Sequence, residues 1–161
     1  MKSLPCLLIG ISLGCSPNPK ASEDQDDAQY TVGIARIDTR GVVVDERIED
    51  RSWVDVDLEF VEGTVDAPAG PADEATWTGH AAIHIRGNSS VGYEKKQYAL
   101  ETRDAAGNDL DVDFFGLPEE EDWVLHAPYS DKTLMRNHLM FTWSRAIGRW
   151  APNTRFVELF M

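Results

Sequence analysis

The sequence of residues 81–100, AAIHIRGNSSVGYEKKQYAL, decides how the fold is interpreted. Its first part, AAIHIR, alternates apolar and polar side chains with a period of two, which is typical of a half-buried strand. Residues 87–90 (GNSS) then interrupt the strand with residue types that favour turns. A second strand is expected to follow, with Lys96 on the face that also carries Tyr98 and Leu100. The stretch therefore predicts a strand, a tight loop and a second strand.

The loop of this hairpin supports two interpretations. In the first, it binds an anion, because backbone N–H groups of a Gly/Ser loop can hold phosphate oxygens and a neighbouring lysine adds a point charge. The candidate residues are Arg86, Gly87, Asn88, Ser89, Ser90 and Lys96, with Lys95 as second choice for the cation. In the second, the loop is a polar turn beside a snorkelling lysine, and Arg86 forms a structural ion pair. Neither GxxxxGK[ST] nor GxGxxG is present, so the loop alone does not choose between them.

Three further motifs stand in a fixed order along the chain. IRGNSS at residues 85–90 is followed by KKQYALE at 95–101 and by FFGLPEEEDWVLHAPYSDKTLMRN at 114–137. In order and spacing they resemble the CotH kinase family, named for spore-coat protein H, and the resemblance extends over about residues 34–161. It implies an exported protein with an atypical protein-kinase-like fold.

The resemblance also implies a chemistry. Proteins of this family would use ATP with Mg²⁺, or another divalent cation, to transfer the γ-phosphoryl group to a hydroxyl of a protein substrate. Residues 87–90 would be the phosphate loop, Lys96 its cation, and Arg136 and Asn137 would line or brace the nucleotide cleft. The metal-binding and catalytic acidic residues would lie past Met161, so no catalytic residue or metal ligand is assigned here. For Arg136 an ion pair with a carboxylate such as Glu158 is the alternative.

The function expected on these grounds is that of the N-terminal, nucleotide-binding part of an exported CotH-like protein kinase. Such a chain would be an atypical kinase when completed by a C-terminal lobe and inactive without it. The alternatives are a non-catalytic surface lipoprotein and a pseudokinase that binds nucleotide without turnover.

The expected fold class is α+β, a mainly antiparallel sheet packed against one long helix, as in the N-terminal lobe of a kinase-like fold that is truncated. Alternation predicts strands at residues 30–37, 53–61 and 110–114, and apolar runs predict two more at 123–125 and 155–161. The helix is expected to open at Ser130 or Asp131 and to stop at Gly148. Its apolar residues at four-residue spacing are predicted to be core: Met135, Leu139, Trp143 and Ile147. His126, His138 and Arg145 are expected at the surface.

The N-terminus reads as an export signal. Residues 1–15 have a short basic start, an apolar run too short to span a bilayer, and Cys15 after small residues. This predicts a lipoprotein signal with lipid on Cys15, and an ordinary secretory signal is the alternative. Residues 16–29 combine proline, serine and acidic side chains, which predicts a flexible linker. Residues 30–161 are then expected to be the N-terminal part of a CotH kinase-like domain.

Composition limits the partners. The formal net charge is −13, which argues against a nucleic-acid partner because phosphate backbones attract basic surfaces. Hydrophobic residues make up 42% of the chain, as in an ordinary globular domain. The expected partners are a protein substrate at the cell surface or envelope and the membrane, reached through the lipid on Cys15. The expected location is outside the cytoplasm, either membrane-anchored or extracellular.

Overall fold

The structure is a computed structural model that describes residues 4–10, 33–44, 52–63, 66 and 69–161. The predictions for Cys15 and for the linker at 16–29 fall outside the described residues. Among the described residues, no helix has the length and apolar composition of a membrane span.

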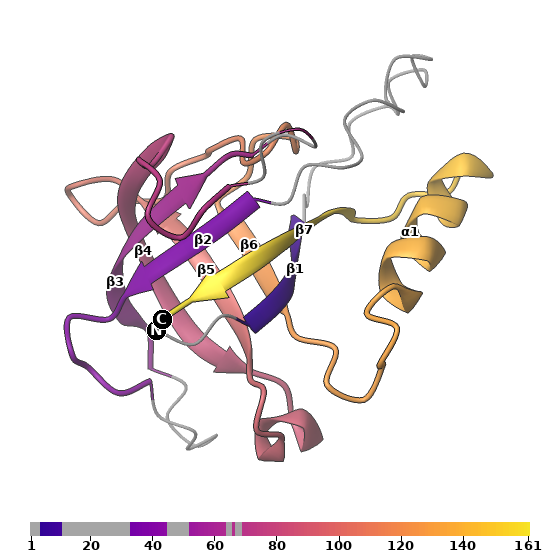
Figure 1. Ribbon diagram of the computed structural model, residues 1–161, viewed down its shortest axis with the longest axis horizontal. Coiled ribbons are helices and arrows are strands. Elements are labelled where there is room, and N and C mark those ends of the chain that lie inside the picture. Colours follow the sequence, from indigo (N-terminus) through magenta and orange to yellow (C-terminus); the bar gives the residue numbers. More distant parts are fainter. Residues whose placement is uncertain (1–3, 11–32, 45–51, 64–65, 67–68) are drawn as a thin grey trace.

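One curled sheet dominates the molecule (Figure 1). Its strands are β2 (Gly33–Asp38), β3 (Val54–Val61), β4 (Trp77–Arg86), β5 (Gln97–Arg103), β6 (Asp122–His126) and β7 (Asn153–Phe160), in the spatial order β6-β5-β4-β3-β2-β7. Neighbouring strands are antiparallel except β2 and β7, which are parallel. The predicted class, mainly sheet with one helix, is therefore confirmed.

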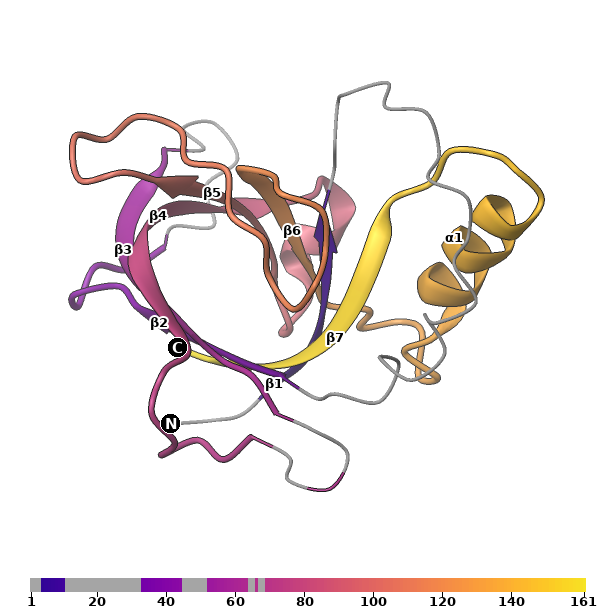
Figure 2. The ribbon, with the colours of Figure 1, turned by 90° about the horizontal axis from the view of Figure 1, so that it is seen from above.

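A seventh strand closes the sheet. β1 (Leu4–Gly10) pairs antiparallel with both edge strands, β6 and β7. Figure 2 shows the resulting ring of strands, with α1 (Arg136–Ala146) outside it. β1 lies within residues 1–15, the stretch predicted to be an export signal. That prediction, and the removal of this stretch on export, stay predictions.

The interior of the ring is filled by the residues that the period-2 pattern places inward. On β3, Val56, Leu58 and Phe60 are at most 2% exposed, while Asp55, Asp57 and Glu59 face outward. The same alternation buries Ala81 and Ile83 on β4 and Leu100 on β5. The strand predictions for these segments are confirmed.

The segment between β5 and β6 folds into the ring. Residues 110–114 were expected to be a strand, but they form only one isolated bridge, Val112–Glu120, and Asp109 just before them forms another with Arg103. Instead, Phe114 inserts between Phe60 and Trp123, with ring centroids 4.0 and 4.9 Å away. The alternation is real, but it serves to bury one apolar face inside the sheet rather than to extend the sheet.

The helix packs by a different face from the one predicted. It begins at Arg136 rather than at residue 130 or 131, and Gly148, with φ +80°, follows its end as expected. The predicted core stripe is exposed: Met135 44%, Leu139 36%, Trp143 59% and Ile147 71%. The prediction is wrong because a second face, spaced i, i+3, i+7, meets the sheet instead.

That second face contains two residues expected at the surface. His138 Nδ1 lies 2.7 Å from Thr154 Oγ1 of β7, and Arg145 donates a hydrogen bond to the Pro152 carbonyl. Phe141, between them, packs with Val124 and Phe156. Burial is the main cause that lowers the pKa of His138, followed by the charges of Arg145 and Arg155. The helix is therefore held to the sheet by a small contact, and its apolar outer face is left uncovered.

Candidate functional site

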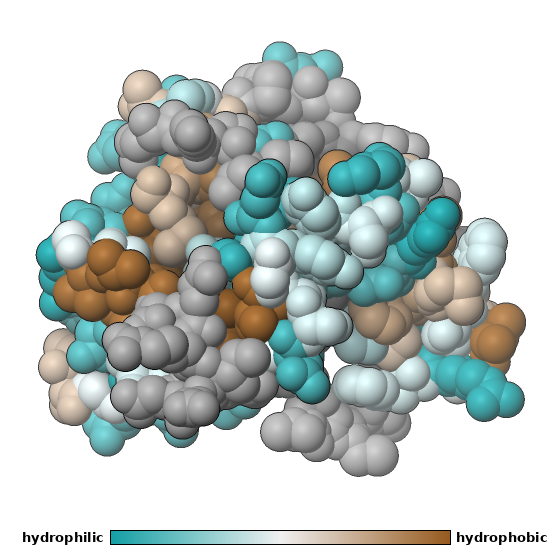
Figure 3. Space-filling view, turned by 90° about the horizontal axis from the view of Figure 1, so that it is seen from below, coloured by the Kyte–Doolittle hydropathy of each residue, from teal (hydrophilic) through white to brown (hydrophobic). Residues whose placement is uncertain are grey.

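The candidate residues come together because of the strand order. β4 ends at Arg86, β5 begins opposite it at Gln97, and β6 returns to end at His126. The β4–β5 loop and the connection from β6 to α1 therefore leave the sheet at the same end. This end is the lower one in Figure 1, and Figure 3 views it from below, with mostly pale and hydrophilic side chains from the middle to the right and the largest hydrophobic area on the left.

The β4–β5 loop is a tight bend followed by a short helical turn. Gly87 has φ +117°, a conformation that side chains rarely allow, and a Cβ there would lie 2.0 Å from Ser90 Oγ. Residues Ser89–Gly92 form one turn of 3₁₀ helix. Glycine is therefore required at position 87, where the chain leaves β4.

Lys96 folds back onto this turn. Its Nζ donates a 2.7 Å hydrogen bond to the carbonyl oxygen of Val91, and its side chain is half-buried. The positive charge is thus held beside the bend at residues 87–90 rather than extended into solvent.

Two more cations lie at this end, and both act on His126. Burial is the main cause that lowers the pKa of His126, and the charges of Arg86 and Lys95 lower it further, while Asp131 opposes them. Charges shift a neighbouring pKa in this way only from nearby. Arg86, Lys95 and Lys96 therefore form a cationic group around the loop.

His126 connects three elements. Its Nδ1 lies 2.8 Å from Gln97 Oε1 on β5, and its Nε2 lies 3.0 Å from Asn137 Nδ2 on α1. The expectation that His126 is an exposed loop residue is wrong: it is the last residue of β6 and is half-buried. The reason is that β6 extends one residue further than the apolar run 123–125, so that the ring lies between β5 and α1.

Arg136 stands at the first position of α1, near the same end. Its side chain is 76% exposed, and its Nε lies 3.5 Å from Asp131 Oδ1. Of the two alternatives for Arg136, the ion pair is thus present, but with Asp131 rather than with Glu158. Asp131 also accepts hydrogen bonds from the Thr133 hydroxyl and the Arg136 backbone N–H, and these contacts, the Thr133 hydroxyl first, lower the pKa of Asp131.

A pair of tyrosines covers the side of this end. Tyr93, after the 3₁₀ turn, stacks on Tyr129 of the β6–α1 connection, with ring centroids 4.9 Å apart. Lys132 Nζ lies 4.6 Å from the centre of the Tyr129 ring and donates to the Tyr129 carbonyl. The two connections are therefore in contact through side chains as well as through His126.

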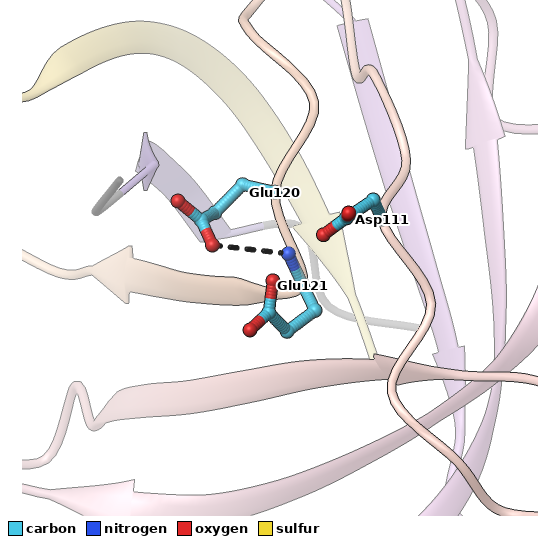
Figure 4. A group of neighbouring side chains, drawn as sticks. All are labelled: Asp111, Glu120 and Glu121. Carbon is cyan, nitrogen blue, oxygen red and sulfur yellow. Dashed lines mark hydrogen bonds between the residues drawn. The ribbon is translucent and has the colours of Figure 1, made fainter. Parts of the chain in front are cut away.

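An acidic cluster lies at the opposite end of the sheet. Asp111, Glu120 and Glu121 bring ligand oxygens within 4.8 Å of one another (Figure 4), and the Glu121 backbone N–H donates to Glu120 Oε1 at 3.3 Å. A hydrogen bond with Glu121 raises the pKa of Asp111. The cluster belongs to the β5–β6 connection, which leaves β5 at the far end from the β4–β5 loop. It is therefore not placed to hold a cation on an anion bound at residues 87–90.

A hollow of about 240 Å³ lies elsewhere, over β3 and β4. Its lining includes Arg40 and Arg103, but Arg40 pairs with Asp57 and Arg103 pairs with Asp55 and Glu101. Both cations of this hollow are therefore paired with carboxylates.

Comparison with known proteins gives one match. Residues 83–161 match the family described as CotH kinase protein. The match begins within β4 and includes the β4–β5 loop, the β6–α1 connection and α1, and it spans just under half of the chain. It confirms the CotH resemblance over that part. No curated protein and no solved structure matches the chain.

The CotH-matching region contains every candidate binding residue: Arg86, Gly87, Asn88, Ser89, Ser90, Lys95, Lys96 and Arg136. All lie at one end of the sheet. Cys15, the predicted lipid site, lies outside the described residues. Sequence analysis missed His126 and Gln97 as members of this end, although both stand in motifs that carry the resemblance.

Proposed function

We propose that the end of the sheet formed by the β4–β5 loop binds the phosphates of ATP, as the N-terminal lobe of a CotH-like protein kinase. The observation that carries the proposal is the position of Lys96, whose ammonium group is held against the Ser89–Gly92 turn inside the CotH-matching region. Gly87 supports it, because its φ of +117° turns the chain sharply where it leaves β4, and backbone N–H groups in such Gly-containing bends can bind phosphate oxygens.

The residues present suit the phosphates. Arg86 stands before the bend in the chain and Lys95 after it, and the charges of both lower the pKa of His126. Phosphate oxygens would take hydrogen bonds from the loop N–H groups and charge–charge attraction from the three cations. ATP would supply the γ-phosphoryl group that a kinase transfers, and the chain's own contribution would be binding and orientation.

Among the described residues, the group of carboxylates that could hold a divalent cation does not lie at this end of the sheet. Asp131 is the carboxylate bonded to the start of α1, and it is engaged by Thr133 and Arg136. The acidic cluster of Asp111, Glu120 and Glu121 lies at the other end of the sheet. The proposal therefore assigns no metal-binding or catalytic carboxylate, and the role it gives to the residues at this end is to bind and orient the nucleotide.

NMR chemical-shift mapping tests the binding proposal. Titration with Mg·ATP is expected to move the backbone amides of residues 87–92 and of Lys96, and Lys96→Ala is expected to weaken binding about 10- to 100-fold, as the loss of a charged hydrogen bond does. Arg40→Ala, which removes a cation paired with Asp57, is the matched control and should leave binding unchanged. Amide shifts confined to other parts of the chain would refute the proposal.

We also propose that the protein is exported and anchored by lipid on Cys15, and that its substrate is a protein at the cell envelope. The support is the order of a basic start, an apolar run and a cysteine after small residues. Cells fed a clickable fatty acid should label the wild type and not Cys15→Ser. Label retained by Cys15→Ser would exclude this site, and an unlabelled wild type would favour the secretory alternative.

A further inference from the structure

His126 is held as a neutral ring by its hydrogen bonds. Asn137 Nδ2 carries two hydrogens and lies 3.0 Å from Nε2, so it donates and Nε2 accepts. The ring proton is then on Nδ1, which donates to Gln97 Oε1 at 2.8 Å. A second proton on Nε2 would face the N–H group of Asn137, and the amide would have to turn before the ring could be charged.

Three charged groups act on His126, and one of them, Arg86, stands opposite Gln97, the residue whose Oε1 contacts the ring. Arg86 belongs to β4, Lys95 precedes β5, and Asp131 lies in the connection before α1. Two of the three are cations, so a proton on His126 would be repelled more than attracted. An anion bound between Arg86 and Lys95 would reverse that balance, because its charge offsets theirs at short range.

We propose that His126 is a positioning residue for the phosphate site and that it takes up a proton when an anion binds there. The inference rests on the proposed function, since it concerns the same loop. The proton moves from solvent to Nε2, the Asn137 amide turns to accept from it, and the ring continues to link β5 to α1. Anion binding at the loop is thereby transmitted to the first turn of the helix that carries Arg136.

Protonation of His126 and anion binding at the β4–β5 loop must affect each other equally, because the two equilibria are thermodynamically linked. If a bound anion makes His126 easier to protonate, then protonation must strengthen anion binding by the same factor. A pKa raised by about half a unit corresponds to an affinity about 3-fold higher at low pH than at high pH. A residue that only supports the fold would give no such dependence.

The experiment uses inorganic sulfate, which carries no proton that titrates over the range studied. The ring resonance of His126, identified by its loss in His126→Gln, is followed from about pH 8 to about pH 5 in sulfate and in chloride at equal ionic strength. We expect the pKa of His126 to be higher in sulfate by about half a unit or more. We also expect sulfate affinity to rise about 3-fold or more on acidification in the wild type and to stay level in His126→Gln. His84→Gln, on β4, should keep the wild-type pH dependence.

The two proposals fail separately. If sulfate moves the amides of residues 87–92 while the titration of His126 is unchanged, the coupling is wrong and the phosphate site stands. If sulfate moves neither, the coupling is wrong, and the phosphate site fails as well only when Mg·ATP also leaves those amides unmoved. If His126→Gln does not fold, the His126 resonance of the wild type is assigned by elimination, from the resonances lost in His80→Gln, His84→Gln and His138→Gln, and the inference stays testable.

Discussion

Replacing Gly87 by alanine should destabilise the protein through two separable effects. The first is backbone strain, because φ +117° is a conformation that costs a residue with a side chain about 1–3 kcal/mol. The second is steric, because the new Cβ would lie 2.0 Å from Ser90 Oγ. Reduced freedom of the unfolded chain returns about 0.4–1 kcal/mol. The expected net loss of unfolding free energy is about 1–3 kcal/mol.

Urea unfolding followed by tryptophan fluorescence measures this loss. In a Ser90→Ala background the contact is removed and the strain remains, so Gly87→Ala should cost less there by about 0.5–1 kcal/mol. Gly92→Ala is the matched control, since its Cβ would meet nothing within 4 Å, and it should stay within about 0.5 kcal/mol of the wild type. Equal midpoints for Gly87→Ala and Gly92→Ala would show that the bend is not as described.

Three further predictions concern the rest of the fold. Trp143→Ser should change the free energy of unfolding by less than about 1 kcal/mol, because Trp143 is 59% exposed, whereas Trp123→Ala should cost about 3–5 kcal/mol in the same urea assay. Similar losses for the two variants would contradict the outward orientation of Leu139 and Trp143 on α1. Thr102→Val should lower the free energy of unfolding by about 1–3 kcal/mol, because the buried Thr102 hydroxyl donates a 2.7 Å hydrogen bond to the Leu110 carbonyl. Amide hydrogen exchange in the β5–β6 connection should become faster, and unchanged exchange would argue that this hydrogen bond does not hold the connection. The hydrogen bond from Arg40 lowers the pKa of Asp57 from 3.8 to about 2, so ionised Asp57 stabilises the folded state fully above the pKa of the unfolded chain, and this stabilisation is lost as pH falls from about 4 to about 2. Acid unfolding of Asp57→Asn should lack this component, and identical acid-unfolding profiles of the variant and the wild type would refute it.

The strands could be predicted from the sequence where one face is buried and the other is exposed to solvent. On β3 the alternation of Val56, Leu58 and Phe60 with acidic residues determines both the element and its inward face. The same pattern at residues 110–114 was misread, because Phe114 alternates to fill the interior of the ring and not to pair with a neighbouring strand. Period alone does not separate these two uses.

The orientation of α1 was not predictable from periodicity. The helix has apolar residues on two faces, and the larger set, which includes Leu139 and Trp143, is the one left exposed. The face that meets the sheet consists of His138, Phe141 and Arg145. His138 contacts Thr154 on β7, Arg145 donates to the Pro152 carbonyl just before β7, and Phe141 packs with apolar side chains of the sheet. Such a choice depends on long-range contacts.

The loop of the candidate site could be predicted from the sequence, but the contacts of His126 that hold the neighbouring elements together could not. The GNSS bend and the lysine that follows are local features, and the structure places the Lys96 ammonium group against the turn after that bend. His126 was missed because its partners, Gln97 and Asn137, are 29 and 11 residues away along the chain. The pairing of β5 with β6 brings the first contact together, and the position of α1 brings the second.

The affinity of the wild type for Mg·ATP, compared by calorimetry with that of Lys96→Ala, is the most direct test of the phosphate site. The expected result is measurable binding by the wild type and a loss of about 10- to 100-fold in Lys96→Ala, with Arg40→Ala unaffected. Equal affinities of the wild type and Lys96→Ala would contradict the assignment of this end of the sheet to nucleotide phosphates.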